Sequence, residues 1–222
     1  MLREGYQYGA AFGATALLLG LALAPWTAMP VLAVGLFLMY FFRDPERQIP
    51  TGPGLMVSPA DGRVVEVRQA DGDGRPCQRV SIFLSPLNVH VNRSPVAGQI
   101  REVCYAPGRF FAAWKEEASI ENERNTITVD TEGGPVIFKQ IAGVLARRVV
   151  CWKKSGESVA RGERIGLMKF SSRMDVIMDP AWELAVKAGD HVVGGVSILA
   201  RLTELVGAPV RPASSRSEGD TA

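Results

Sequence analysis

The chain has 222 residues and a net charge of +2, a balance that indicates no particular class of charged partner. No basic run is interleaved with aromatic residues, so nucleic-acid binding is not expected. The 3 cysteines lack Cys-x-x-Cys spacing and the chain has only 2 histidines, His90 and His191, so we expect neither a disulfide framework nor a metal centre.

The N-terminal part is physically distinct from the rest of the chain. From Gly5 to Phe42, 38 consecutive residues include no charged residue and no histidine. Two prolines divide this stretch into apolar segments over Tyr6–Leu23 and Val31–Phe42. A helix that spans a bilayer needs about 20 apolar residues. These lengths favour a hydrophobic helical hairpin over residues 1–42 that crosses or dips into a membrane and anchors the chain.

Aromatic and basic residues suggest how the hairpin would lie. Aromatic side chains gather at membrane interfaces, and short cytoplasmic segments are rich in Lys and Arg. The aromatic candidates are Trp26, Tyr40, Phe41 and Phe42, and the basic ones are Arg3, Arg43 and Arg47. This pattern predicts a cell-membrane protein whose soluble part, after the hairpin, lies on the cytoplasmic side. A signal peptide ending at Ala22-Leu23-Ala24, or a buried core hairpin, is the alternative.

Residues 43–205 read as a β-rich domain. Short runs rich in Val and Ile alternate with Gly, Pro, Asn and Asp, and turn signals recur roughly every 8–15 residues. The expected strands are Gly62–Val67, Arg79–Leu84, Gln99–Val103, Thr126–Val129, Val136–Ile141 and Val149–Trp152. We expect one helix over Phe110–Glu117. Residues 206–222 have no core-forming pattern and are expected to be a disordered tail.

A weak internal repeat refines the fold. The phrase Gly-[Asp/Glu]-x-Val-x-x-Gly-x-x-Ile occurs at Gly156–Ile165 and again at Gly189–Ile198. It resembles the hairpins of biotinyl and lipoyl carrier domains. That resemblance implies a flattened β-sandwich, or barrel-sandwich hybrid, whose halves are related by pseudo-symmetry.

Three short motifs contain residues capable of chemistry. Ser171 and Ser172 stand side by side in a predicted turn between two strands, followed by Arg173 and Asp175. Asp61 lies in Ser-Pro-Ala-Asp-Gly, and His90 in an apolar alternation bounded by Ser-Pro on both sides. Each alone is more often structural. Together, a serine, a histidine and an aspartate are the groups that activate a hydroxyl.

The order of these phrases resembles a known family. They are Phe41-Phe-Arg-Asp-Pro-Glu-Arg47, Ser58-Pro-Ala-Asp-Gly62, Ile82-Phe-Leu-Ser-Pro-Leu-Asn-Val-His-Val-Asn-Arg93, Glu121-Asn-Glu-Arg124, Gln140-Ile-Ala-Gly143, Ala146-Arg-Arg148 and Lys169-Phe-Ser-Ser-Arg173. From about Tyr40 to Ala200 the chain resembles short-form, pyruvoyl-dependent phosphatidylserine decarboxylases. Any single phrase is weak evidence, whereas seven in order are a strong signal.

The resemblance implies a self-processing enzyme. Ser172 would attack the carbonyl of Ser171, and the chain would split into a large subunit, 1–171, and a small subunit, 172–222. The small subunit would begin with a covalent pyruvoyl cofactor derived from Ser172. Asp61 and His90 match the acid and base that activate the serine. The mature enzyme would convert phosphatidylserine in the membrane to phosphatidylethanolamine and CO2.

Two positions depart from the family pattern. The cleavage point usually reads Gly-Ser, whereas Ser171 precedes Ser172 here. Some relatives carry a second histidine where this chain has Arg93, so the division of roles for His90 stays open. On charge alone, Arg147 and Arg148 are candidate partners for a phosphate or carboxylate.

Other readings of the sequence compete with this one. A carrier domain modified on Lys169 is the runner-up, followed by a phosphotransferase-type β-sandwich that uses His90 and by a structural membrane adaptor. The sequence leaves open whether the chain forms a homo-oligomer. Self-cleavage separates the decarboxylase from the others.

Overall fold

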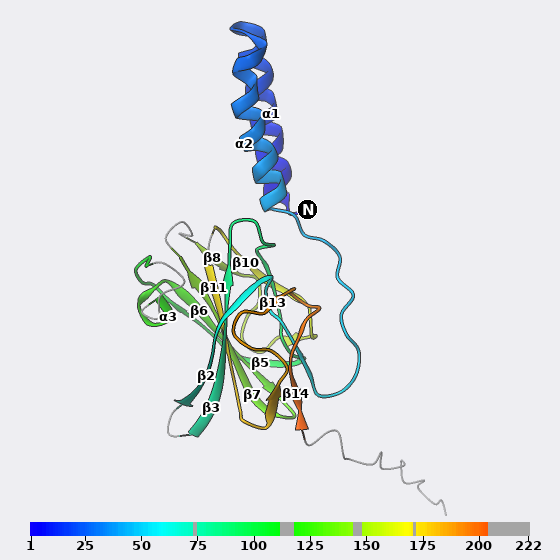
Figure 1. Cartoon of the computed structure of the whole chain (residues 1–222), viewed down its shortest axis with the longest axis vertical. Helices are drawn as coiled ribbons and strands as arrows, with labels where there is room; N and C mark the ends of the chain where they lie inside the picture. The colour runs from blue at the N-terminus through cyan, green and yellow to red at the C-terminus, as the bar shows by residue number, and fades with distance from the viewer. Residues whose placement is uncertain (73–74, 112–117, 144–147, 171, 204–222) are drawn as a thin grey trace, which may run out of the picture.

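A computed structural model describes residues 1–72, 75–111, 118–143, 148–170 and 172–203. A pair of helices at the N-terminal end of the chain stands on a β-rich body, and the segment that follows Phe42 connects the two (Figure 1). The strands enclose the main core, which includes Val80, Ile82, Phe138 and Val176, all fully buried. The predicted class, mainly β with an N-terminal helical hairpin, is confirmed.

The hairpin consists of α1 (Arg3–Ala22), a 3₁₀ turn (Pro25–Thr27) and α2 (Ala28–Phe41). α2 begins earlier than the expected Val31, because a proline is tolerated in the first turn of a helix. The helices approach closely: a Cβ on Gly35 would lie 2.8 Å from Phe12 Cβ. Among the described residues, neither of these helices, nor any other, combines the length and apolarity that crossing a membrane requires.

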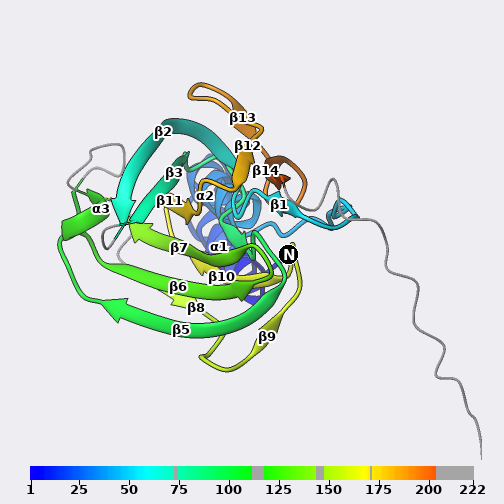
Figure 2. The same ribbon diagram turned by 90° about the horizontal axis from the view of Figure 1, so that it is seen from below.

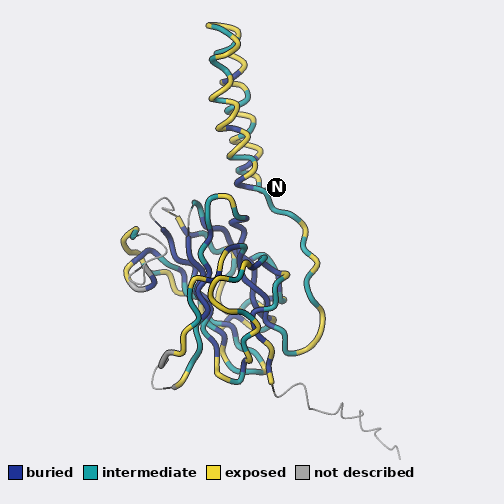
Figure 3. Tube along the Cα trace, viewed as in Figure 1, coloured by how far each residue is buried: buried dark blue, intermediate teal, exposed yellow. Residues whose placement is uncertain are grey.

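The outer surface of the hairpin is apolar and exposed. Figure 3 shows exposed residues along nearly its whole length, whereas the centre of the β body is buried. Leu21 is 78% exposed and Trp26 is 72% exposed, both at the end far from the body. Exposed apolar patches of this kind mark contact with a protein or a membrane.

One long sheet forms most of the β body. Its order is β13-β2-β3-β11-β7-β6-β5-β9, every neighbouring pair is antiparallel, and it curls into a half-barrel (Figure 2). The bounds of its strands are β2 Gly62–Gly72, β3 Arg75–Leu84, β5 Gly98–Ala106, β6 Arg124–Thr131, β7 Gly134–Ala142, β9 Ser158–Val159, β11 Ser172–Met178 and β13 His191–Val192.

Two three-stranded sheets, β1-β14-β12 and β4-β10-β8, complete the body. Their strands are β1 Leu55–Val57, β4 Val91–Arg93, β8 Val149–Cys151, β10 Arg164–Met168, β12 Trp182–Leu184 and β14 Ile198–Leu202. All six strands expected from the sequence are present, extended at one or both ends except β8, which is one residue shorter.

The repeat in the sequence corresponds to a repeat in the fold. The two edge strands of the long sheet, β9 and β13, occupy the same position within each glycine phrase. The second glycines of the phrases, Gly162 and Gly195, have φ of 76° and 77°, a region that favours glycine. The Ile49 side chain packs against both, because a Cβ on either would lie within 3.0 Å of it.

A second repeat, not noticed in the sequence, begins each half of the long sheet. Ser58-Pro-Ala-Asp-Gly62 precedes β2, and Ser94-Pro-Val-Ala-Gly98 precedes β5. In both motifs the Ser Oγ donates to the carbonyl two residues later, at 2.7 Å. The backbones also exchange bonds: Val57 N donates to Pro95 O (2.9 Å) and Arg93 N to Pro59 O (2.8 Å). The two corners are therefore locked together.

The helix, the tail and the serine turn expected from the sequence are only partly described by the structure or differ from it. Of the helix expected over Phe110–Glu117, Phe110 and Phe111 are not helical and residues 112–117 lie outside the described part. The short helix α3 follows at Ala118–Glu121. The tail 206–222 also lies outside the described residues. Ser172 begins strand β11 rather than lying within a turn.

The corner glycines give a test of packing. A Cβ on Gly98 would lie 2.0 Å from Asp130 O on β6, so Gly98→Ala must push β5 away from its neighbour. We expect it to destabilise the protein by about 1–3 kcal/mol, measured as a fall of at least about 2 °C in Tm. Gly13→Ala, on α1 with nothing within 4 Å of the added Cβ, is the control and should not lower Tm. An unchanged Tm for Gly98→Ala would contradict this packing.

Candidate active site

Strand register places a row of residues across the end of the long sheet nearest the hairpin. Ser172 on β11 lies opposite Leu84 on β3 and Ala142 on β7. The row continues to Glu123, whose carbonyl accepts a hydrogen bond from Ala142 N (2.9 Å). On the other side, β2 begins at Gly62 beside Phe83, the residue before Leu84, and directly after Asp61. The predicted serine and aspartate therefore lie at the same end of the sheet.

The Ser172 hydroxyl is buried and unpartnered. The residue is 0% exposed, and its Oγ has no hydrogen-bond partner among the residues described. Leaving a buried hydroxyl unpaired costs about 1–3 kcal/mol, and such groups are rare outside functional sites. An unpaired Oγ is free to react.

The opposite face of β11 holds this strand in place. Arg173 is 2% exposed and donates to Asp175 (2.6 Å), to Ser81 Oγ (2.7 Å) and to Glu66 (3.2 Å). Ser119 Oγ donates to the other oxygen of Asp175 at 2.6 Å. Because side chains alternate along a strand, this network faces away from Ser172. It fixes the backbone that carries the Ser172 hydroxyl.

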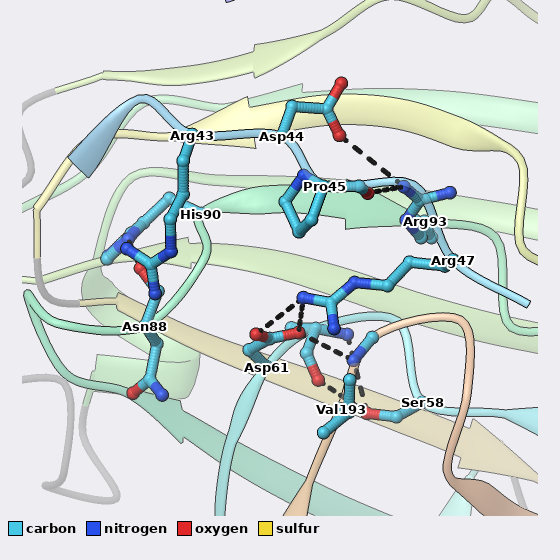
Figure 4. Close-up of polar contacts among 12 residues, drawn as sticks. Arg43, Asp44, Pro45, Arg47, Ser58, Asp61, Asn88, His90, Arg93 and Val193 are labelled. Atoms are coloured by element: carbon cyan, nitrogen blue, oxygen red, sulfur yellow. Dashed lines mark hydrogen bonds and ion pairs between the residues drawn. The ribbon is translucent and has the colours of Figure 1, made fainter. Parts of the chain in front are cut away.

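A short loop between β3 and β4 orients His90. Asn88 Oδ1 accepts from both the backbone N (2.9 Å) and the Oγ (2.8 Å) of Ser85, which closes the loop. The Asn88 carbonyl lies 2.9 Å from His90 Nδ1 (Figure 4). Since a carbonyl can only accept, Nδ1 carries the proton and Nε2 holds a free lone pair. Nε2 is buried and unpartnered within the described residues.

Burial keeps the His90 ring neutral. Desolvation lowers its pKa from 6.5 to about 4; the hydrogen bond to Asn88 opposes the shift and the positive charge of Arg43 adds to it. At neutral pH the imidazole is therefore uncharged, with an accepting Nε2. This is the state that a general base requires.

Phe41, at the end of α2, packs against both sides of the candidate site. Its ring centre is 4.3 Å from that of His90 and 4.3 Å from that of Phe170. Phe170 has φ of 59°, a left-handed conformation that costs roughly 1–2 kcal/mol for a residue with a Cβ. Met168 N also donates to the His90 carbonyl (3.2 Å). These contacts bring His90 beside the segment that leads into Ser172.

Asp61 binds other groups. Its carboxylate accepts two hydrogen bonds from Arg47 Nη2, at 2.9 and 3.1 Å, and one from Gly194 N at 2.8 Å (Figure 4). The part of the chain that the structure describes contains no hydrogen bond between Asp61 and His90. The structure thus brings His90 to the segment before Ser172, and places Asp61 at the same sheet end in an ion pair of its own.

Arg93, which replaces a second histidine of some relatives, has a structural position. It donates to the carbonyls of Gly162 (2.9 Å) and Pro45 (3.3 Å) and to Asp44 (3.5 Å). Burial lowers its pKa. Asp44 also pairs with Arg164 at 2.8 Å. Arg93 therefore ties the segment after the hairpin to the β body and does not face His90 (Figure 4).

The remaining predicted residues have mixed outcomes. Ser171 and Arg147 lie outside the described residues. Arg148 is exposed, and its carbonyl accepts from Lys169 N (3.4 Å). Lys169 is half-buried, with its ammonium 5.8 Å from the centre of the Phe42 ring. A carrier domain needs an exposed lysine for its modification, so the packing of Lys169 does not favour the carrier interpretation.

Comparison with known proteins agrees with this geometry. Residues 34–200 match the family model described as phosphatidylserine decarboxylase. A protein of Solibacter usitatus called phosphatidylserine decarboxylase proenzyme is 51% identical over 201 residues, which cover 90% of this chain and 96% of that protein. The chain belongs to the phosphatidylserine decarboxylase family. A proenzyme of the same name from Syntrophus aciditrophicus is 44% identical, with 89% of this chain and 95% of that protein covered.

Sequence reasoning missed several residues of the site. Phe41, Arg43 and Arg47 were considered only as membrane-interface residues and as part of one family phrase, and Asn88 only as part of another. An aromatic pair followed by alternating charges directly after an apolar segment was the available signal. Their partners, His90, Leu87 and Asp61, are distant in sequence, so the fold alone reveals these contacts.

The lowered pKa of His90 predicts how stability depends on pH. The unfolded chain protonates this residue below pH 6.5, whereas the folded protein resists until about pH 4. The contribution of neutral His90 to the free energy of unfolding is therefore fully present above pH 6.5. It falls by on the order of 3 kcal/mol as the pH drops towards 4. In urea unfolding, the Ser172→Ala protein should show this pH dependence, and the same protein with the added change His90→Phe should lack it. His191→Phe, a change at an exposed site, should retain it; equal behaviour of the two would contradict the assignment.

Phe41 supplies part of the burial of His90, so removing its ring should restore water to the imidazole. We expect Phe41→Ala to raise the pKa of His90 from about 4 towards 6.5, observed by NMR titration of the ring protons. Phe37→Ala is the matched control: Phe37 lies one turn earlier on α2 and is 39% exposed. A His90 pKa that stays near 4 in Phe41→Ala would show that other groups bury the ring.

Proposed function

We propose that this protein cleaves itself between Ser171 and Ser172 and then decarboxylates phosphatidylserine to phosphatidylethanolamine and CO2. One observation carries the proposal beyond family membership. Two buried polar atoms, Ser172 Oγ and His90 Nε2, lack partners at the same end of the sheet, one a nucleophile and the other a base. Apart from function, retaining two such atoms would only destabilise the fold.

In the proposed maturation, His90 Nε2 takes the proton of Ser172 as Oγ attacks the carbonyl carbon of Ser171. His90 passes this proton to the Ser172 nitrogen as the peptide C–N bond breaks, so an ester forms and the Ser172 amine becomes free. Removal of the Ser172 α-proton then breaks the Cβ–Oγ bond and releases residues 1–171 with a carboxylate end. Hydrolysis of the new N-terminus then releases its nitrogen as ammonia and leaves a pyruvoyl group on residues 172–222.

The residues present fit such a group. Ser172 is the buried first residue of β11, so its converted form would be shielded from water, and His90 contacts the segment that precedes it through Met168 and Phe41. When present, the pyruvoyl ketone accepts the electrons of the broken carbon–carboxylate bond. His90, neutral and with a free Nε2, is suited to hold and return a proton there. Asp61 is proposed as a second acid–base group on family grounds, with Arg47 setting its orientation.

The proposed location is the cell membrane, with the catalytic body on the cytoplasmic side. The support is the exposed apolar surface of the hairpin, together with the fact that the substrate is a bilayer lipid. The hairpin base contacts His90 through Phe41, so the candidate site lies at the end of the body that would face the lipid.

Intact-mass spectrometry tests the maturation. We expect two fragments, 1–171 and 172–222, and the smaller should be lighter by one ammonia than the same peptide beginning with serine. Ser172→Ala should remain one chain, because it lacks the nucleophile. Ser171→Ala keeps the nucleophile and should still be cut. A single unmodified chain for the parent protein would refute the proposal, and extra mass on Lys169 would instead favour a carrier domain.

A further inference from the structure

We propose that Arg43 and Lys169 form a binding site for the phosphodiester group of a lipid substrate, a step that rests on the proposed function. Both cations lie where the hairpin joins the body. Arg43 immediately follows the aromatic pair Phe41-Phe42, and the Lys169 ammonium is 5.8 Å from the centre of the Phe42 ring.

Each cation lies against the ring of a residue next to Phe41 in the chain, and Phe41 packs on His90. The Arg43 guanidinium lies 3.8 Å from the centre of the Tyr40 ring, and it donates to the carbonyls of Tyr40 (2.9 Å) and Leu87 (2.7 Å). The Leu87 bond ties it to the loop that orients His90, and Figure 4 shows its side chain beside that ring. Its charge also lowers the pKa of His90, as expected for a nearby cation.

Neither cation has a carboxylate partner among the described residues. Three other arginines of this region do: Arg47 pairs with Asp61, while Arg93 and Arg164 share Asp44. Arg43 and Lys169 therefore present two positive charges without a carboxylate partner at the base of the hairpin, where Phe41 contacts the candidate base. A partly buried cation without a counterion favours binding of an anion.

The geometry favours the phosphodiester over the carboxylate as that anion. A cation paired with the carboxylate would stabilise the charged ground state and oppose its loss as neutral CO2. The phosphodiester keeps its charge throughout the reaction, so binding it positions the substrate without that penalty. It also lies next to the acyl chains, as these cations lie next to the exposed apolar hairpin. The forked guanidinium suits two phosphate oxygens, and the lysine adds a point charge.

Binding to the uncut Ser172→Ala protein tests the site without requiring catalysis. Dihexanoylphosphatidylserine, titrated calorimetrically below its micelle concentration, carries the phosphodiester, whereas O-hexyl-serine carries the same amine and carboxylate without it. We expect Arg43→Gln and Lys169→Gln each to weaken binding of the first ligand about tenfold or more, and to change binding of the second less than twofold. Arg201→Gln, at an exposed position on β14, is the control and should leave both affinities unchanged.

Several outcomes would overturn the site. Equal losses for both ligands would mean that the variants disturb the fold or His90. Unchanged affinity for dihexanoylphosphatidylserine would mean that the phosphodiester binds elsewhere. Inorganic phosphate binding as tightly as the lipid would assign the cations to free phosphate. Lys169→Gln is the cleaner variant, because the Lys169 side chain has no hydrogen bond among the described residues.

Kinetics of the mature enzyme separate this proposal from the proposed function. Loss of phosphodiester binding should raise KM for phosphatidylserine about tenfold or more in both variants. Lys169→Gln should leave kcat nearly unchanged, whereas Arg43→Gln also acts on His90 through Leu87 and through its charge, so only its KM tests the site. An active decarboxylase whose KM is unaffected by both variants overturns the phosphodiester site and leaves the proposed function standing. Protein that shows the binding pattern but never decarboxylates overturns the proposed function and leaves an anion site.

Discussion

The packing of the Phe41 ring against His90 is the contact on which the rest of the candidate site depends. It joins the last turn of the apolar hairpin to the residue best suited to act as base, and the same ring packs on Phe170, two residues before Ser172. Burial beneath this ring contributes to keeping His90 neutral. Hairpin, base and strained backbone are therefore one packed unit, so movement of the hairpin would alter the chemistry directly.

The β body supplies a nearly symmetric frame to which this unit is attached. Matched glycine phrases and matched Ser-Pro corners build both halves of the long sheet, yet the functional groups lie at one end only. Asp61 in the first corner corresponds to Ala97 in the second. The symmetry provides rigidity, since each corner holds the other through backbone bonds, and the departures from symmetry mark where chemistry has been added.

The sequence predicted the parts of this structure that depend on local patterns. Strand alternation located β2, β3, β5, β6, β7 and β8, and the uncharged segment located the hairpin. Family phrases singled out Asp61, His90 and Ser172. Partners could not be predicted, because ion pairs such as Arg47 with Asp61 and ring contacts such as Phe41 with His90 join residues separated by whole strands. No local pattern encodes them.

Arg93 shows how a family position can change its physical role. It is almost buried, and it ties Asp44 and Pro45 to the carbonyl of Gly162, so it holds the segment that leaves the hairpin against the β body. A histidine, which has two ring nitrogens and a shorter side chain, could not make three such bonds at once. In this chain the position therefore stabilises the connection between hairpin and body, which leaves His90 as the one imidazole that contacts Phe41 and faces the cleavage segment among the described residues.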